Sequence, residues 1–335
     1  MREQKFLFHR INFIKVLKIT IGAFLAVFIA SLLDISYSTS AGVITILSIQ
    51  NTKRETLLIV GKRIGAFFIA LIIAFLSFYL FGYEVIAIAF FLLLFSILCN
   101  VFSLQDGLVM NTVLIFHFYG EQSMSLFWIK NELMILFIGT GIGIIMNSYM
   151  PGNAKLIRKN QEYLEGAIRE VLHQMSSMIR MENGACYTDI HFQMLDEKLE
   201  KMALWAYEER DNTLTFENRY FIKYVQLRKN QSFTLKQLYK DIQLLHAVPV
   251  QAIMVSDYIE EISKTFHEYN NGEMLKKQLE NILEMMKGQP LPTTREEFED
   301  RAILYRILYD LEEFLQIKIQ FIMTLTEEEI ERFWK

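Results

Sequence analysis

The sequence predicts an all-α protein: a bundle of six transmembrane helices in residues 1–152, followed by a soluble helical bundle in residues 153–335. Charged residues are unevenly distributed, with 17 in residues 1–150 and 55 in residues 151–335. The first part also contains six intervals without Asp, Glu, Lys or Arg, whereas the second shows helical spacing of apolar residues. This division, in a chain with 52% hydrophobic residues, excludes a wholly soluble enzyme, a secreted disulfide scaffold and a disordered chain.

The uncharged intervals define the expected membrane spans. A helix needs about 20 mainly apolar residues to cross the hydrocarbon core of a bilayer. The third, fourth and sixth intervals reach this length unaided, and the first reaches it if the lysines before it extend to the headgroups. The second and fifth are short, so whether they cross fully is left open. The six intervals are 19–33, 35–52, 64–83, 85–105, 107–120 and 133–154.

The distribution of basic residues predicts the orientation. With an even number of spans, the basic residues of segments 2–18, 53–63 and 155–159 all fall on one side of the membrane. The positive-inside rule therefore places both termini in the cytoplasm and predicts a multi-pass protein of the cell membrane. The apolar run near the N-terminus is expected to be an uncleaved first helix, because further apolar runs follow it at once.

Three spans carry small residues four positions apart, which let helix backbones approach closely in lipid. Packing within one bundle and packing between two protomers both fit this pattern. The three ladders are Gly22, Ala26 and Ala30; Ala66, Ala70 and Ala74; and Gly139 and Gly143, continued by Asn147.

The second part of the chain predicts helices throughout. Pro151 ends the last span, and Asn153 is expected to cap a helix that begins near Ala154. Apolar spacing and turn residues predict further helices near 189–210, 215–247, 250–269 and 273–287. A capping box from Thr294 to Glu297 is expected to open a final helix.

One uncharged stretch, 242–256, is hydrophobic enough to suggest a seventh span. Because it is only 15 residues long and contains Pro249 and polar residues, we interpret it as a buried helix–proline–helix corner of the soluble bundle.

Motifs for catalysis, cofactors or metals are missing from the sequence. It has no phosphate-binding loop, and no signature organises its Ser, Cys and His residues into a catalytic site. Glu170 and His173 form only half of a di-metal motif, and a solvated surface pair is the alternative interpretation. Cys99 and Cys186 lie in segments expected in different solvents, so no disulfide is expected. We therefore predict no enzyme, no cofactor, no metal and no nucleic-acid partner.

Two basic residues before the third span are candidates for binding an anion. Lys62 and Arg63 are either interfacial anchors or functional cations that hold a carboxylate by charge-assisted hydrogen bonds. Gln50, Asn51 and Thr52 precede them and are expected to add neutral donors.

Two further titratable residues lie in or beside the fifth interval. Asp106 belongs either to a solvated inner loop or to a proton-accepting site. His117 is either a satisfied structural histidine or a group that titrates near neutral pH through a water-filled path.

The segments Ser48–Thr52, Gly61–Ala66 and Asn147–Pro151 together resemble the bacterial aromatic acid exporter family, which is related to fusaric acid resistance proteins. In that family a short second span ends in a Gln-containing turn, and the next helix begins with Arg, Gly and a small residue. Gln50, Arg63, Gly65, Asn147 and Pro151 stand at matching positions, and Ala66 stands where Thr is usual. The second half is similar to the helical C-terminal domain of Firmicute members.

The resemblance implies proton-driven export of aromatic carboxylates or related small organic anions. Larger relatives carry two six-span units, so this chain is expected to form a homodimer or a higher homo-oligomer in the lipid bilayer, with the small-residue ladders as candidate contacts. Asn147 joins the candidate pathway residues on this ground. The alternative is a membrane-anchored regulatory or interaction module whose C-terminal bundle binds a ligand or a protein.

Overall fold

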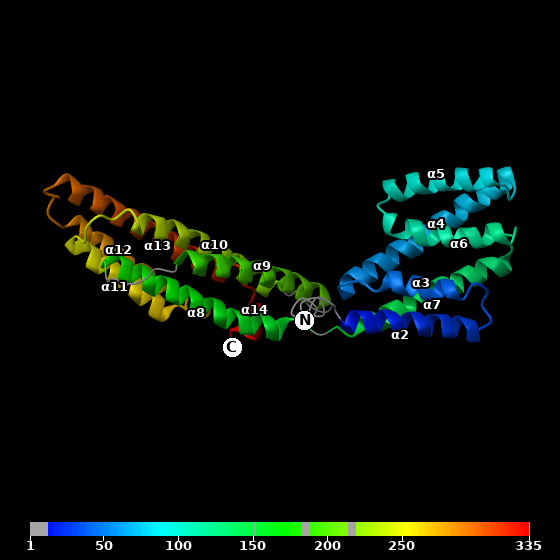
Figure 1. Ribbon diagram of the computed structural model, residues 1–335, viewed down its shortest axis with the longest axis horizontal. Coiled ribbons are helices and arrows are strands. Elements are labelled where there is room, and N and C mark those ends of the chain that lie inside the picture. Colours follow the sequence, from blue (N-terminus) through cyan, green and yellow to red (C-terminus); the bar gives the residue numbers. More distant parts are fainter. Residues whose placement is uncertain (1–12, 151, 182–187, 214–218, 335) are drawn as a thin grey trace, which may run out of the picture. The chain divides into compact units, whose positions relative to one another are not determined.

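A computed structural model of the protein describes residues 13–150, 152–181, 188–213 and 219–334, and every regular element in these ranges is helical. These residues form two compact units that divide near residue 151, each with its own core (Figure 1). The first unit contains α2 (Phe13–Leu32), α3 (Thr39–Ser48), α4 (Lys53–Phe81), α5 (Val85–Val101), the 3-10 turn η1 (Gln105–Gly107), α6 (Leu108–Gly120) and α7 (Leu126–Ser148).

Three helices of the first unit are long and apolar enough to cross a membrane: α2, α4 and α7, with 20, 29 and 23 residues. Helices α3, α5 and α6 have 10, 17 and 13 residues. The expected span 85–105 is therefore shorter than the sequence indicates. Its helix stops at Val101 because Ser103 adopts a left-handed φ of 55° and Leu104 N–H turns back to the carbonyl oxygen of Cys99 at 2.8 Å.

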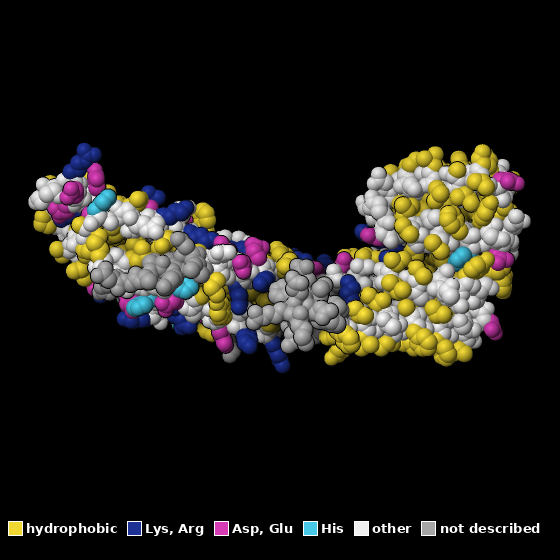
Figure 2. Space-filling view, viewed as in Figure 1, with side chains coloured by type: hydrophobic (Ala, Val, Ile, Leu, Met, Phe, Trp, Pro, Cys, Tyr) yellow, Lys and Arg dark blue, Asp and Glu magenta, His cyan; other side chains and the backbone are white. Residues whose placement is uncertain are grey.

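The surface of the first unit is mainly apolar. Large side chains such as Phe28, Ile72, Phe75 and Leu93 are at least half exposed, and Figure 2 shows hydrophobic atoms over this unit with few charges between them. Charged side chains are instead frequent on the other unit in the same view. Continuous exposed apolar surface of this extent is typical of a membrane protein.

The small-residue ladders pack within one chain. Ala26, Ala30, Ala66, Ala70 and Ala74 have no exposed surface. A Cβ atom on the glycine at position 139 would lie 2.6 Å from the Cβ atom of Ile44 on α3 and 2.8 Å from a backbone carbonyl oxygen of the same helix. The small residues thus allow α2, α3, α4 and α7 to approach one another within one chain.

The second unit contains α8 (Ala154–Ile179), α9 (Thr188–Asn212), α10 (Tyr220–Ile242), α11 (Val250–Thr265), α12 (Glu273–Lys287), α13 (Arg295–Met323) and α14 (Glu327–Phe333). Its core combines apolar residues of all seven helices, among them Leu164, Leu199, Leu238 and Leu308. Helix α8 begins at Ala154 as expected, but the Asn153 side chain donates to Glu208 at 2.8 Å and does not cap the helix.

The capping box expected at Thr294 is only half formed. Thr294 accepts a hydrogen bond from the N–H of Glu297 at 3.1 Å, but the Glu297 carboxylate accepts the backbone N–H of Thr293 instead of closing the box. A complete box occurs at Thr326 and Glu329, where it opens α14, a separate helix that the sequence analysis did not anticipate.

The corner at Pro249 is present, but it is only partly buried. Helix α10 ends at residue 242 and α11 begins directly after Pro249. Ala252 and Val255 have no exposed surface, whereas Leu244 and Val250 are 52% and 78% exposed. The expected helix–proline–helix arrangement is therefore present, but its burial is partial, because only the inward face of α11 packs against the core.

Two residue pairs singled out in the sequence are the half metal motif of Glu170 and His173 and the two cysteines, and the structure describes both residues of the first pair and one residue of the second. His173 pairs with Glu260 at 2.7 Å and not with Glu170, which accepts from Gln174. Cys99 is buried and free, while residue 186 lies outside the described residues. Within the described ranges, no group of three or more His, Cys, Asp or Glu side chains is arranged to hold a metal ion.

Candidate functional site

The guanidinium group of Arg63 lies inside the first unit, with 5% of the residue exposed. Its Nε donates to the carbonyl oxygen of Asp106 at 3.1 Å, and its Nη1 donates to the hydroxyl of Ser48 at 3.0 Å. Within the described part of the chain, Nη2 makes no hydrogen bond. Arg63 therefore joins α4 to α3 and η1 while keeping one end of its donor fork unused.

The local charge around Arg63 is positive. Lys62 forms an ion pair with the Asp106 carboxylate at 2.8 Å, and both side chains are about 40% exposed. One carboxylate thus faces two cations, and it pairs with the exposed one. Among the described residues, the buried guanidinium group hydrogen-bonds only to a hydroxyl and a backbone carbonyl oxygen, and the shared Asp106 carboxylate does not neutralise both cations, which leaves a site that attracts anions.

A close backbone contact holds this arrangement in place. A Cβ atom at Gly107 would lie 2.6 Å from the Cβ atom of Ala66 on α4. Asn111 of α6 donates to the carbonyl oxygen of Arg63 at 3.0 Å. Glycine at position 107 therefore lets η1 bring the Asp106 carbonyl within reach of the arginine.

The other predicted residues of this end form a hydrogen-bonded turn between α3 and α4. Asn147 of α7 donates to the carbonyl oxygens of Gln50 and Thr52 and to the Thr56 hydroxyl, at 3.2, 3.3 and 2.6 Å. The Thr52 hydroxyl caps α4 by accepting the N–H of residue 55 at 3.2 Å. Asn51 accepts from Lys15 at 2.6 Å. The side-chain amide of Gln50 donates to the carbonyl oxygen of Leu47 at 2.7 Å. The side chains of Gln50 and Thr52 therefore both bond to the backbone of this turn.

A cavity of about 150 Å³ opens beside this turn, lined by Lys53, Thr56, Leu57, Ile144, Asn147 and Ser148. The Oδ1 atom of Asn147 is buried without a partner among the described residues. Thr56 and Arg63 are seven residues apart on α4, which places them on the same helix face at about 10 Å along the axis. The cavity is therefore a vestibule two helical turns from the arginine.

His117 belongs to a second polar cluster in the same unit. Its Nδ1 lies 2.8 Å from Oε2 of Glu132 on α7, and its Nε2 lies 3.3 Å from the Ser40 hydroxyl on α3. The ring stacks on Tyr37 with 4.0 Å between the ring centroids. Glu132 has no exposed surface and also accepts from Asn131 at 3.0 Å.

Glu132 is not evident as a site residue in the sequence, because charged residues delimit the uncharged intervals and it stands at the edge of one. The interval 133–154 begins just after it, whereas α7 begins at Leu126 and encloses it in its second turn. Phe127 and Trp128 carried the missing signal, because aromatic residues at a membrane interface mark the start of a span. Ser48 and Asn111 were missed because only their contacts with Arg63 distinguish them.

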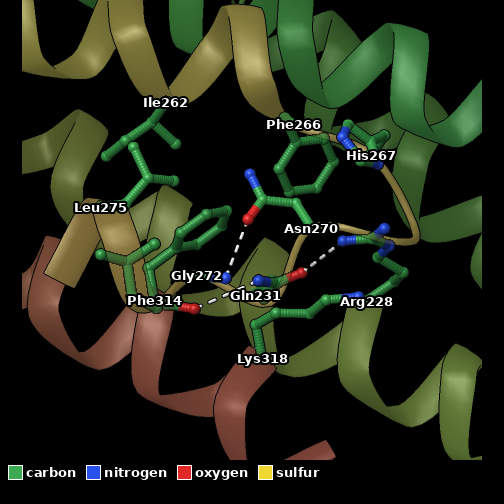
Figure 3. Close-up of a pocket in the computed structure, with 11 residues that line it drawn as sticks. Arg228, Gln231, Ile262, Phe266, His267, Asn270, Gly272, Leu275, Phe314 and Lys318 are labelled. Carbon is green, nitrogen blue, oxygen red and sulfur yellow. Dashed lines mark hydrogen bonds between the residues drawn. The ribbon is translucent and has the colours of Figure 1, made fainter. Parts of the chain in front are cut away.

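The second unit contains a buried charged centre on α10 (Figure 3). Arg228 has no exposed surface and donates to Gln231 at 2.8 Å and to Glu165 of α8 at 2.6 Å. Gln231 in turn donates to the carbonyl oxygen of Phe314 at 3.1 Å. Lys318 lies beside them, and burial, followed by the positive charge of Arg228, lowers its pKa to about 7. The cavity between these groups has about 20 Å³, which suits a single water molecule.

A carboxylate organises the neighbouring part of this unit. Glu268 accepts two hydrogen bonds from Arg158, at 2.8 and 2.7 Å, and one from Tyr220. Burial and the adjacent Glu268 carboxylate raise the pKa of Tyr220 above its ordinary value. A cavity of about 520 Å³ lies on this side of the unit, with Lys155, Arg158, Lys159, Arg332, Phe221 and Phe333 in its lining.

Comparisons with known proteins cover nearly the whole chain. A family model described as aromatic acid exporter family member 1 matches residues 11–150, and one described as putative aromatic acid exporter C-terminal domain matches residues 154–319. The chain is 29% identical to the uncharacterized protein YqjA of Bacillus subtilis (strain 168) over 312 residues, 92% of this chain and 95% of that one. A crystal structure of a putative membrane protein from Clostridium difficile 630 matches 51% of this chain and 99% of its own, at 29% identity and a TM-score of 0.46. The two matched domains, the extended similarity to the Bacillus protein and the apolar first unit place this chain in the aromatic acid exporter family.

Proposed function

We propose that the protein exports aromatic carboxylic acids or related small organic anions across the cell membrane, with Arg63 as the cation that binds the carboxylate. Membership of an exporter family supports transport. The observation that carries the anion specificity is the buried guanidinium group, whose Nη2 end is unused and whose nearest carboxylate pairs with Lys62. A carboxylate accepts two parallel hydrogen bonds from such a group.

The proposed topology has six apolar helices in the membrane and both termini in the cytoplasm. Helices α3, α5 and α6 are short, so they require neighbouring protein to shield their ends. In this orientation Lys53, Lys62 and Arg63 lie at the cytoplasmic side, where an exported anion enters. The protein acts as a homodimer or higher homo-oligomer and uses the proton gradient.

The vestibule beside Asn147 is a site of entry that must enlarge. Its volume of about 150 Å³ is below the roughly 300 Å³ of typical ligand pockets. Helices α4 and α7 form its two walls. Transport therefore requires these two helices to separate at their cytoplasmic ends before an aromatic ring reaches Arg63.

Replacing Arg63 by Ala is expected to slow the export of aromatic carboxylates by about 10- to 100-fold, the effect of losing about 1.5–3 kcal/mol of charged hydrogen bonding. Efflux of a panel of labelled aromatic acids from preloaded cells measures this. The matched control is Arg54→Ala, because Arg54 is an exposed arginine on the same helix. Arg63→Lys retains the charge without the fork and is expected to export at an intermediate rate. Equal retention of every compound by wild-type and Arg63→Ala cells would refute the proposal.

A second candidate function is a membrane-anchored module whose second unit binds an organic anion. The cavity lined by Lys155, Lys159, Phe221 and Phe333 favours it, because cations and aromatic rings together recognise an aromatic carboxylate. If this module is correct, benzoate raises the melting temperature of the full-length protein, and Lys155→Ala/Lys159→Ala removes the shift while Arg63→Ala does not. A shift that depends on Arg63 alone would contradict this second function and support the exporter.

A further inference from the structure

Glu132 is a fully buried acid in a mainly apolar helix of the first unit. It lies on α7 with no exposed surface, one residue before a stretch without charges that extends to the end of the helix. Carboxylates in membrane segments are energetically expensive, and they persist where they bind an ion or a proton or pair with another group. Its partners therefore indicate its role.

Two helices supply the immediate partners of this acid, and a third helix supplies the next partner along the hydrogen bonds. One Glu132 oxygen lies 2.8 Å from Nδ1 of His117 on α6, and the other accepts from Asn131 of α7 at 3.0 Å. The second ring nitrogen of His117 faces the hydroxyl of Ser40 on α3 at 3.3 Å. Asn131 also holds the turn before α3, since it exchanges hydrogen bonds of 3.0 and 3.1 Å with the backbone of Ser36.

The hydrogen bonds of His117 suit two protonation states. When Nδ1 carries a proton and Nε2 does not, His117 donates to Glu132 and Nε2 accepts the proton of the Ser40 hydroxyl. When both ring nitrogens carry protons, Nε2 donates to the same hydroxyl, because a hydroxyl group both donates and accepts. The cluster can therefore gain or lose one proton without leaving a buried polar atom unpaired.

The charges near Glu132 are mainly acidic. Among the described residues, no Lys or Arg contacts Glu132, so the pair with a neutral imidazole carries one uncompensated negative charge. Tyr37 stacks on the ring, and its hydroxyl donates to Glu121 at 2.7 Å, which adds a second acid. Lys130 is exposed and lies two residues before Glu132, which turns it to the opposite side of α7. The pair therefore has no fixed positive charge in contact with it among the described residues.

The other elements that pack here contribute no opposing charge. Helix α4 supplies Phe67 and Leu71 to the core shared with α6 and α7, and α2 supplies Ala26 and Ala30. Asp34 is exposed in the turn after α2, where its contribution is that of a solvated acid. Imidazole is thus the single cationic group available to Glu132 among the described residues of these helices.

Exposure decreases from the surface of the first unit to Glu132. Glu121 is exposed, Tyr37 is 38% exposed, the His117 side chain is 11% exposed and Glu132 is fully buried. Tyr37 adopts a left-handed φ of 60°, a conformation that costs a non-glycine residue about 1–2 kcal/mol. Its stacking on His117 and its bond to Glu121 hold this strained residue over the ring.

We propose that the His117–Glu132 pair is a proton-binding site that takes up and releases one proton during the transport cycle. The inference rests on the proposed exporter function, for which it supplies the coupling site. In the proposed topology the pair lies toward the outer side and Arg63 toward the cytoplasm. The proton that moves inward then binds near the outer end of the first unit, and the anion that moves outward binds near its cytoplasmic end.

Helix α3 provides a physical link between the two sites. Its Ser40 contacts His117 and its Ser48 contacts Arg63, eight residues or about 12 Å farther along the helix. Two glycines of α7, at positions 139 and 143, let α3 lie directly against that helix. A small shift of α3 therefore moves Ser40 at one site and Ser48 at the other. A proton that alters the Ser40 contact can thereby change the Ser48 contact with Arg63.

Infrared difference spectra of the full-length protein in lipid nanodiscs test the site without any substrate. Between about pH 5 and pH 8, where histidine titrates, the wild-type protein is expected to give imidazole and buried-carboxyl difference signals. Glu132→Gln is expected to abolish the carboxyl signal and alter the imidazole signal. His117→Gln is expected to abolish the imidazole signal. Asp34→Asn, which changes an exposed acid in the turn after α2, is expected to retain both.

The variants must remain folded for this comparison, and Gln is close in shape to Glu and can still bond to Asn131 and His117. If Glu132→Gln nevertheless unfolds, the His117→Gln spectrum decides instead. Wild-type spectra that are identical to those of the folded variants over this pH range would overturn the inference.

An export assay separates this inference from the proposed function. With an imposed proton gradient, Glu132→Gln is expected to lose the acceleration that the gradient gives to wild-type protein, while Arg63-dependent anion binding persists. Proton binding at the pair without any export would refute the exporter alone. Export that accelerates equally in wild-type and Glu132→Gln protein would refute the coupling site alone.

Discussion

Replacing Arg228 by Met is expected to lower the free energy of unfolding of the second unit by about 3–5 kcal/mol, because it leaves a buried carboxylate without its cation. Arg228 has no exposed surface, bonds to Glu165 at 2.6 Å and lies 4.4 Å from the ring centroid of Phe266. Urea unfolding of the full-length protein in detergent, followed by tryptophan fluorescence, measures the change. Lys229→Met is the control, since its exposed ion pair with Glu200 is worth about 1 kcal/mol or less.

The double variant Arg228→Met/Glu165→Leu tests the physical reason. If the loss in Arg228→Met comes from an unpaired buried carboxylate, removing that carboxylate too restores part of the stability. A double variant whose loss equals the sum of the two single losses would show that the two side chains act independently, against this explanation.

Raising the pH from about 7 to about 9 is expected to stabilise the second unit by up to about 3 kcal/mol through Lys318, at about 1.4 kcal/mol per pH unit. Burial, with Arg228 as the second cause, lowers the pKa of Lys318 from 10.5 to about 7. Between these values the unfolded chain binds the proton and the folded chain does not, so stability rises with pH. Below pH 7 both states bind it, and this contribution to the slope vanishes.

Lys318→Met is expected to remove this part of the pH dependence. The measurement is the urea midpoint at several pH values, with Lys264→Met as the control because Lys264 is 65% exposed and its ion pair lies at the surface. A Lys318→Met variant that keeps the full wild-type slope while Lys264→Met changes it would contradict the assignment to Lys318.

Arg228 and Lys318 show how a helical bundle places charges that sequence periodicity treats as solvated. Both stand on amphipathic helices with many exposed charges, and their residue types do not reveal burial. The apolar seam, by contrast, is evident from spacing. Ile157, Leu164, Ile168 and Val171 follow one another at helical intervals on α8, and all four have no exposed surface. Hydrophobic spacing fixes the inward side of a helix, while the depth of its flanking residues depends on which helices cover it.

The two sites of the first unit differ in how far the sequence predicts them. Arg63 and Asp106 were both singled out, and the structure brings them together through a hydrogen bond to the Asp106 backbone, while the Asp106 carboxylate pairs with Lys62. His117 was singled out too, but its partner Glu132 was treated as the edge of a span. A buried acid resembles an interfacial acid in sequence, because both stand next to apolar runs.

The sequence alone determined the division of this protein into an apolar helical part and a charged helical part, the approximate positions of most helices, and the family, because hydrophobic composition and helical period are properties of consecutive residues. Only the tertiary structure decided the pairing of His117 with Glu132, the use of the small-residue ladders inside one protomer, and the burial of Arg228. These features depend on contacts between residues far apart in the chain, as with Ser40 and His117, and such contacts exist only once the helices pack.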